Sequence, residues 1–373
     1  MTSGIERSLP GQLDRMARAE AVRRSRATLR DTHITLSHGS GGKASHTLFE
    51  AVIAPVFTDP LLETRDDSAV FSLHQNGGMH SAAGVQLAFT TDSYVVSPLF
   101  FPGGDIGKLA VNGTINDLAV AGATPRFLSV GLIIEEGLEI DVLRQVVMSM
   151  AAAAEAAGVR IVTGDTKVVH RGKADLLFVN TSGVGVVRDG CTLSPESARP
   201  GDRVLVNGFI GDHGMAVMLA REALEMEAEI ESDCAPLHTL AAALLEAAPG
   251  TRVLRDPTRG GVATTLNEIA LQSGVCVTID EESVPVRAAV RGACEMLGID
   301  PLHIANEGKL LAIVPEAESD AALATLRGHA LGRDAAVIGQ IIAAPEGMVV
   351  LRTTIGGSRV LDMLVGDPLP RIC

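Results

Sequence analysis

The last residue of the sequence, Cys373, carries a thiol at the end of the segment GDPLPRIC. Pro368 and Pro370 fix φ and lack an N–H donor, so this segment cannot join a helix or a central strand. Leu369 and Ile372 are apolar enough to dock in a groove. A thiol on such an extended, detachable arm can visit another protein and then return to a site on its own chain. The alternative is an incidental terminal cysteine.

Several aspartates are expected at strand ends and on one helix. Any one of them is a common turn residue or helix cap. Together they offer the hard oxygen ligands that Mg²⁺ bound to a polyphosphate requires. They are Asp66 and Asp67 in RDDSAV, Asp92 in TTDSY, Asp117 in INDLA and Asp165 in TGDTK. Whether Asp66 or Asp67 is the ligand stays open.

Asp117 lies in a predicted helix that is otherwise largely apolar. Asn112 and Asn116 lie one turn apart beside it, and Gly113 leaves one face of the helix bare. If this face is buried, the carboxylate must be paired or metal-bound. If the face is exposed, Asp117 is a surface residue, and the sequence leaves both alternatives open.

Two glycine-containing segments precede predicted helices, where backbone N–H groups can bind an anion. HGSGGKASH contains Gly41, Gly42 and Lys43, but it is not a Walker A loop because the lysine is followed by alanine. A structural glycine turn is an equal alternative there. RDPTRGGV places Asp256 and Arg259 before the second helix.

Two further residues have the chemistry of catalytic groups. Lys167, at the mouth of a strand in VTGDTKVVH, could neutralise a developing phosphate or oxyanion charge. A surface salt bridge is its alternative role. Glu307, in ANEGKL, could act as a general base, and a turn carboxylate is the alternative.

The composition favours a soluble cytoplasmic enzyme of two domains. A chain of 373 residues with 46% hydrophobic residues can bury two cores. The net charge of −14 argues against a nucleic-acid surface, and no apolar run is long enough to span a bilayer. Five cysteines without a C-x-x-C spacing disfavour a disulfide framework and a zinc site, so we expect a reducing compartment.

Runs of β-branched residues alternate with helical patterns, which predicts an α/β (α+β) fold. The domains are expected at 33–193 and 200–350, separated by the connector SPESARPGD, with a mobile tail at 365–373. Residues 1–32 are a basic extension, expected to be disordered or to include an over-called start codon, with Met16 as the next candidate start. Among the predicted elements are strands over 86–96, 174–187, 275–279 and 310–314, and helices over 105–123, 139–158, 213–230, 236–248 and 261–274.

The motifs together resemble the HypE family of hydrogenase maturation factors, within the PurM-like ATP-binding superfamily. The resemblance covers about 33–373 and includes HGSGGK, GDTKVVHRG, GDHG, RDPTRGGV, ANEGKL and the terminal PRIC. The PRIC ending is the most specific motif, because other members of the superfamily do not share it. The N-terminal extension departs from the family, which often begins close to the HGSGG loop.

The resemblance implies that the carbamoyltransferase HypF loads a carbamoyl group onto Cys373. The tail then folds into the ATP site, the thiocarboxamide becomes a thiocyanate, and the cyano group passes to iron on the HypC–HypD scaffold. It also implies a homodimer formed through the sheet of the first domain.

The resemblance further implies a role for each motif residue. Lys167 and Glu307 would act with Cys373 in catalysis. Mg²⁺ would be held by Asp67, Asp92, Asp117 and Asp165. ATP would contact these four aspartates and Gly41, Gly42, Lys43, Asn116, Thr166, Asp256 and Arg259.

Two other hypotheses of function remain. Another PurM-like ATP-dependent synthase is possible, although a selenophosphate synthetase would carry Cys or selenocysteine near the glycine loop, where this chain has His38. A non-catalytic docking protein gated by ATP would not hydrolyse ATP in a manner that depends on Cys373.

Overall fold

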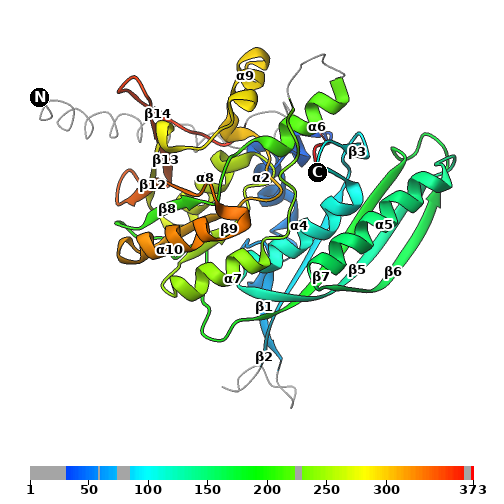
Figure 1. Ribbon diagram of the computed structural model, residues 1–373, viewed down its shortest axis with the longest axis horizontal. Helices are drawn as coiled ribbons and strands as arrows, with labels where there is room; N and C mark the ends of the chain where they lie inside the picture. Colours follow the sequence, from blue (N-terminus) through cyan, green and yellow to red (C-terminus); the bar gives the residue numbers. More distant parts are fainter. Residues whose placement is uncertain (1–30, 58, 74–84, 223–228, 365–370) are drawn as a thin grey trace, which may run out of the picture.

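Two β-sheets from successive parts of the chain form the framework of the protein (Figure 1). The computed structural model describes residues 31–57, 59–73, 85–222, 229–364 and 371–373. The predictions about residues 1–30 and about the prolines of the tail therefore lie outside the described residues, as do residues 223–228 of the helix expected over 213–230, whereas 229–230 are described and are not helical.

The N-terminal sheet has five strands in the order β1-β2-β7-β5-β6, and β5 and β6 are its parallel pair. The burial of β7 alternates along its length, as expected for a sheet with one covered face. The strands are β1 (Ala69–Leu73), β2 (Val85–Tyr94), β5 (Ala123–Glu135), β6 (Arg160–Val169) and β7 (Leu177–Val187). Preceding or connecting segments include α2 (Lys43–Leu48), α3 (Pro60–Glu63), β3 (Phe100–Phe101) and β4 (Gly104–Asp105).

Helices α4 (Ile106–Val120) and α5 (Ile140–Ala156) cover one face of this sheet (Figure 1). The side chain of Asp105 caps α4 by accepting hydrogen bonds from the backbone N–H groups of Gly107 and Lys108. Helix α4 is buried almost all round because it also packs against α7 (His238–Ala247) of the second half. Its polar residues are therefore enclosed between the two halves.

The other face of the N-terminal sheet carries exposed side chains. Ile133 on β5 is 42% exposed, and Phe89 on β2 is 44% exposed. On β6 nearly every residue is exposed. We call this surface the open face of the sheet.

The second sheet has seven strands in the order β14-β13-β10-β12-β8-β11-β9. Helix α8 (Gly261–Ser273) packs on one face, and α7 and α10 (Glu316–Gly328) pack on the other. The strands are β8 (Arg203–Val206), β9 (Val253–Arg255), β10 (Cys276–Asp280), β11 (Leu311–Val314), β12 (Ala336–Ile342), β13 (Met348–Arg352) and β14 (Ser358–Val360). The remaining helices are α6 (Asp212–Glu222) and α9 (Ala288–Leu297).

Most of the elements expected from the sequence pattern are confirmed, but Asp165 is an exception. The residue was expected at a strand end, and it lies in the middle of β6. The Gly164-Asp165 pair resembles a turn signal, yet Gly164 pairs with Val130 inside a parallel ladder. Pairing with a neighbouring strand has therefore overridden the local turn preference.

Candidate active site

Acidic side chains from β2, α4 and the loop before β1 meet at the boundary between the two halves. The hydroxyl of Thr90 lies 2.7 Å from Oδ2 of Asp117 and 2.9 Å from the backbone carbonyl of Asp67. Ser68 donates a hydrogen bond to the backbone carbonyl of Asp117. These contacts place the backbone of Asp67 beside Asp117, whereas Asp66 lines the cleft described below.

Arg255, at the end of β9, is the buried cation of this region. Its guanidinium lies 2.6 Å from Asp67 and 3.1 Å from Glu268. A buried carboxylate without a cation or a proton is strongly unfavourable. Arg255 therefore allows the acidic residues of both halves to meet.

The adjacent loop brings Asp256 and Arg259 to the same place. Arg259 donates a hydrogen bond to Oδ1 of Asp92 at 3.3 Å. The loop can turn sharply into α8 because Gly260 and Gly261 adopt positive φ. A side chain on Gly261 would also lie 2.6 Å from the carbonyl oxygens of Leu302 and Ile304.

The carboxylates of this cluster raise one another's pKa. Burial raises the pKa of Asp256 to about 6, with further increases from Asp92 and Asp66. Burial and the charges of Asp256, Asp92 and Asp67 raise the pKa of Asp117 well above its ordinary value. Burial likewise raises the pKa of Asp67, although Arg255 opposes the shift. When these carboxyl groups are ionised, the cluster holds negative charge that Arg255 alone does not compensate.

This charge suits a divalent cation. Across the described ranges, no three His, Cys, Asp or Glu side chains already converge as a metal site. Mg²⁺ is commonly held by one or two carboxylates together with substrate phosphates. Asp67, Asp92 and Asp117 have the donor chemistry for this role.

Asp165 and Lys167 lie on the open face, away from the cluster of the same chain. In the β2–β7 ladder Asp92 lies directly opposite the buried Thr181, whose hydroxyl bonds to Thr114 on α4. The side chain of Asp92 is therefore directed toward α4 as well. Asp165 lies opposite Gly131 in the β5–β6 ladder, and Gly131 lies opposite Asn180 in the β5–β7 ladder. Asn180 is the neighbour of Thr181 on β7 and points to the other face of the sheet, so Asp165 points to that face too. Asp165 and Lys167 form a 2.6 Å ion pair in which both side chains are 69% exposed. Within one chain, Lys167 therefore makes the surface salt bridge that was its alternative role. Thr166, between them, points to the other side of β6.

The glycine loop packs against Arg259 and the residues that lead to the tail. Gly41 has φ +75°, and a side chain there would lie 2.7 Å from Cβ of Arg259. The backbone N–H of Lys43 donates to the carbonyl of Leu364 at 3.0 Å, and its ammonium pairs with Asp362. Gly42 approaches Leu364 too closely for a side chain. The loop thus contacts the segment before the tail, as well as bordering a cleft.

That cleft has a volume of about 610 Å³ and opens beside the acidic cluster. Its lining includes Gly41, Phe49, Leu62, Asp66 and Glu268. Apolar walls with a few polar groups at one end are typical of pockets for small molecules.

Glu307 is buried at the loop before β11, next to the cluster. Burial and the charges of Asp256, Asp92 and Asp233 raise its pKa well above the ordinary value, and Arg259 opposes this. Its backbone carbonyl accepts a hydrogen bond from Asn116 at 3.0 Å. Asn116 also bonds to the backbone of Ala235 and Leu237. The side-chain amide of Asn116 thus bonds to the loop of Glu307 and to the segment before α7, which is a structural role.

Cys373 is 9% exposed and lies beside Arg259, between α6 and β3 (Figure 1). Backbone N–H groups of Val95 and Ser97 donate to the carbonyls of Cys373 and Arg371. The negative charge at Cys373 raises the pKa of Arg259, with additional increases from Asp92 and Glu307. The end of the chain is therefore docked at the acidic site.

Sequence reasoning missed several residues on which this geometry depends. Arg255 was available from its position before the DPTRGG motif, where a strand-end arginine needs acidic partners. His213, in the GDHG motif, contacts the tail. Thr90 and Asp233 carried no signal in the sequence, because their roles depend on contacts between distant segments.

The comparisons with known proteins agree with this geometry. Residues 65–187 match the N-terminal domain of AIR synthase related proteins, and residues 199–352 match the C-terminal domain of that family. The carbamoyl dehydratase HypE of Rhodobacter capsulatus is 53% identical over 345 residues, which cover 92% of this chain and 99% of that protein. This chain belongs to the HypE family.

Solved structures of HypE proteins have the same fold. A HypE–HypF complex matches with a TM-score of 0.78 and 47% identity, covering 85% of this chain and 99% of the other. A HypE protein in complex with ATP matches with a TM-score of 0.75 and 48% identity, covering 91% and 100% of the two chains. The predicted family and its two-domain PurM-like fold are confirmed. In the part of the chain that the structure describes, no helix is sufficiently long and apolar to cross a bilayer.

Proposed function

We propose that this protein catalyses the ATP-dependent dehydration of a carbamoyl group carried on the sulfur of Cys373. The observation that supports this most directly is the docked position of Cys373, which lines one pocket together with Arg259, the residue that pairs with Asp92. A substrate attached to Sγ would thus be enclosed with a cation and a carboxyl group.

The reaction converts the carbamoyl oxygen, which is a poor leaving group, into part of a phosphate, which is a good one. The carbamoyl oxygen attacks the γ-phosphorus of ATP and ADP leaves, so that the oxygen becomes part of a phosphate ester. The C–O bond then breaks, phosphate departs, and the two nitrogen-bound protons are lost as the C≡N bond forms. The product is a thiocyanate on Cys373, and the cyano group would supply the cyanide ligand of [NiFe]-hydrogenase iron.

Each role follows from the position of a side chain. Glu307 accepts protons from nitrogen, and its raised pKa makes the ionised form a stronger base. Arg259 binds negative charge beside the sulfur. ATP occupies the 610 Å³ cleft, where Gly41, which lines it, faces the phosphates. Mg²⁺, held by aspartates of the cluster, would neutralise charge on the phosphates.

Asp165 and Lys167 enter this scheme through a homodimer. The open face carries apolar residues such as Phe89 and Ile133. A symmetric dimer through this face would bury them, and it would carry Lys167 to the site of the partner. Lys167 would there stabilise the oxygen that is phosphorylated.

The partners follow from the chemistry and the family. HypF would load the carbamoyl group, and a HypE protein has been solved in a complex with HypF. The HypC–HypD scaffold would accept the cyano group, in the cytoplasm.

Intact-mass measurement tests the proposal. The protein is incubated with HypF and carbamoyl phosphate, with and without ATP. One carbamoyl group should add to Cys373, and one water should then be lost where ATP is present. A carbamoyl adduct that persists in Cys373→Ala, or an adduct that keeps its mass with ATP, would refute the function.

A further inference from the structure

The backbone of the docked tail pairs with the segment that follows β2. Ser97 and Val95 donate to the carbonyls of Arg371 and Cys373 at 3.2 and 3.1 Å, which is an antiparallel pairing that continues β2. The carbonyl between them, that of Ile372, faces the other way and lies 2.6 Å from Nε2 of His213. His213 thus contacts the second edge of the tail, and Arg221 also donates a hydrogen bond to the carbonyl of Arg371 at 2.7 Å.

The hydrogen bonds of His213 define its tautomer. A carbonyl can only accept, so Nε2 carries the hydrogen and donates to Ile372. Nδ1 then accepts from the hydroxyl of Ser232 at 2.8 Å, and that hydroxyl accepts from the N–H of Cys234 at 3.1 Å. Burial lowers the pKa of His213, which agrees with a neutral ring. Phe101 packs edge-on against the imidazole of His213, with 5.4 Å between the two ring centroids.

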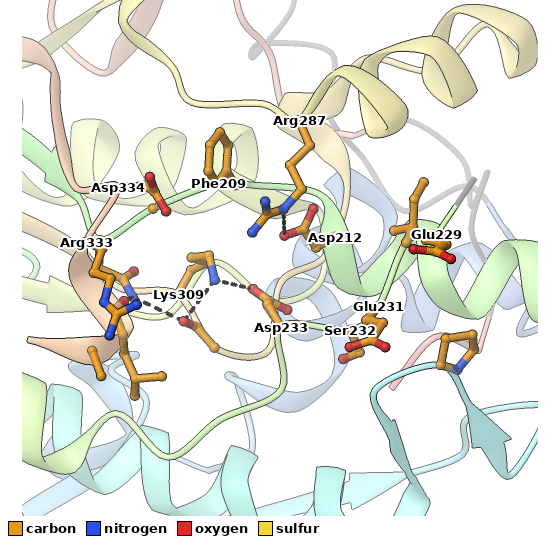
Figure 2. A pocket seen from close by; sticks show the side chains of 17 residues that line it. Phe209, Asp212, Glu229, Glu231, Ser232, Asp233, Arg287, Lys309, Arg333 and Asp334 are labelled. Atoms are coloured by element: carbon orange, nitrogen blue, oxygen red, sulfur yellow. Dashed lines mark hydrogen bonds and ion pairs between the residues drawn. The ribbon is translucent and has the colours of Figure 1, made fainter. Parts of the chain in front are cut away.

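The residue after Ser232 contacts Glu307. Oδ1 of Asp233 accepts the backbone N–H of Glu307 at 3.0 Å, and its carboxylate pairs with Lys309 at 2.9 Å. Figure 2 shows Asp233 and Lys309 pointing toward each other at a cleft of about 820 Å³, with Ser232 beside them. Although burial opposes ionisation, Lys309 lowers the pKa of Asp233, so it stays charged and accepting.

A continuous set of contacts therefore joins the tail to Glu307. It runs from the carbonyl of Ile372 through His213 to Ser232, continues along the chain to the next residue, Asp233, and ends at the backbone of Glu307. We propose that His213 is a positioning residue that holds the docked tail and, through Ser232 and Asp233, fixes Glu307 in place for the carbamoyl group. This rests on the proposed function, because Glu307 acts only in the dehydration step.

The first test measures the tail contact without any turnover. His213→Ala removes the donor to Ile372, and the rate of maleimide labelling of Cys373 should rise about tenfold. Labelling is measured by mass spectrometry of the C-terminal peptide released by cleavage before Asp367. His238→Ala, in α7 and away from the tail, is the matched control and should label at the wild-type rate. An unchanged rate in His213→Ala overturns the tail contact.

The second test separates holding the tail from positioning Glu307. Ser232→Ala keeps the imidazole but breaks the connection to the loop. Its Cys373 labelling should stay within about twofold of wild type, while single-turnover water loss falls about tenfold. Carbamoyl loading by HypF should be normal in both variants. Normal water loss in Ser232→Ala would overturn the coupling.

Hydrogen exchange gives a readout that is independent of activity. The amide of Glu307 should exchange faster in His213→Ala and Ser232→Ala than in wild type and His238→Ala, since the Asp233 acceptor is no longer fixed. Equal exchange in all four proteins contradicts the coupling. Failure of wild type to lose water would instead refute the proposed function, and the labelling and exchange results would still decide the contact.

Discussion

The guanidinium of Arg255 lies 2.6 Å from the carboxylate of Asp67, and the two side chains are 10% and 15% exposed. Asp67 comes from the loop before the N-terminal sheet, and Arg255 ends a strand of the second sheet. The pair therefore joins the two halves of the molecule at the floor of the acidic cluster.

Arg255→Gln should reduce stability substantially. Removing one partner of a buried ion pair leaves the other charge uncompensated, which typically costs about 3 kcal/mol. Here Glu268 also loses its partner. Denaturant unfolding of the metal-free protein measures the change in free energy. The control is Arg359→Gln, because the Arg359–Asp300 pair is more exposed and should contribute less than about 1 kcal/mol. Equal losses in the two variants would contradict the role given to Arg255.

The nucleotide-free protein should become less stable as the pH rises from mildly acidic to mildly basic. A carboxyl group whose pKa is raised on folding favours the folded state while protonated, and this contribution disappears as pH rises through the folded pKa. For Asp256 that value is about 6, and Asp117 is shifted in the same direction. The melting temperature should therefore fall from pH 5 to pH 8. Asp117→Asn should flatten the profile, and Mg²⁺ with ATP should also reduce the fall. A profile that rises over this interval is the contrary result.

The rate of dehydration should fall at acidic pH, and the midpoint of this fall should lie above the pKa of an ordinary glutamate, which is about 4.3. Glu307 must be ionised to accept a proton, and burial raises its pKa. Single-turnover water loss should therefore increase with pH through this shifted value. Glu307→Gln should load normally and lose water at least about 100-fold more slowly. Since Arg259 opposes the shift, Arg259→Gln should move the midpoint to higher pH. Normal water loss in Glu307→Gln would remove it from the mechanism.

The sequence was sufficient for the fold because its motifs and its hydrophobic periodicity agree. The apolar helix around Asp117 and the strands over 86–96 and 174–187 were predicted with nearly correct bounds. The motifs also identified Arg259 and Cys373, which the structure brings together. These residues are adjacent to glycine turns or to the chain terminus, where local sequence determines backbone conformation.

The parts that sequence could not provide are contacts between distant segments. Asp165 follows a turn-like glycine, but strand pairing placed it within β6 and on the open face. Asn116 appeared to be a ligand residue, whereas its amide bonds to two distant loops. No local pattern predicts that Ser232 links His213 to the loop of Glu307.

A charge on the open face should weaken the proposed dimer. Ile133→Lys replaces an apolar residue that is 42% exposed on β5 and would be buried between two sheets. Sedimentation of wild type should show a dimer, and the variant should dissociate at micromolar concentration. Met296→Lys, on α9, is the control because its 72% exposed side chain lies in the other half. A wild-type protein that is monomeric at all concentrations would contradict the dimer.

Mixing two inactive variants should restore activity if Lys167 serves the partner's site. Lys167→Ala and Glu307→Ala each disable both sites of their own homodimer. In a mixed dimer, the site that contains Glu307 belongs to the Lys167→Ala chain and receives Lys167 from the other chain. Random exchange then gives half mixed dimers with one intact site each, so water loss should reach about a quarter of the wild-type rate. If Lys167 acted within its own chain, every site in the mixture would lack one of the two residues and no water would be lost. The mass of carbamoylated Cys373 before and after ATP addition distinguishes these outcomes, and unmixed variants provide the baseline.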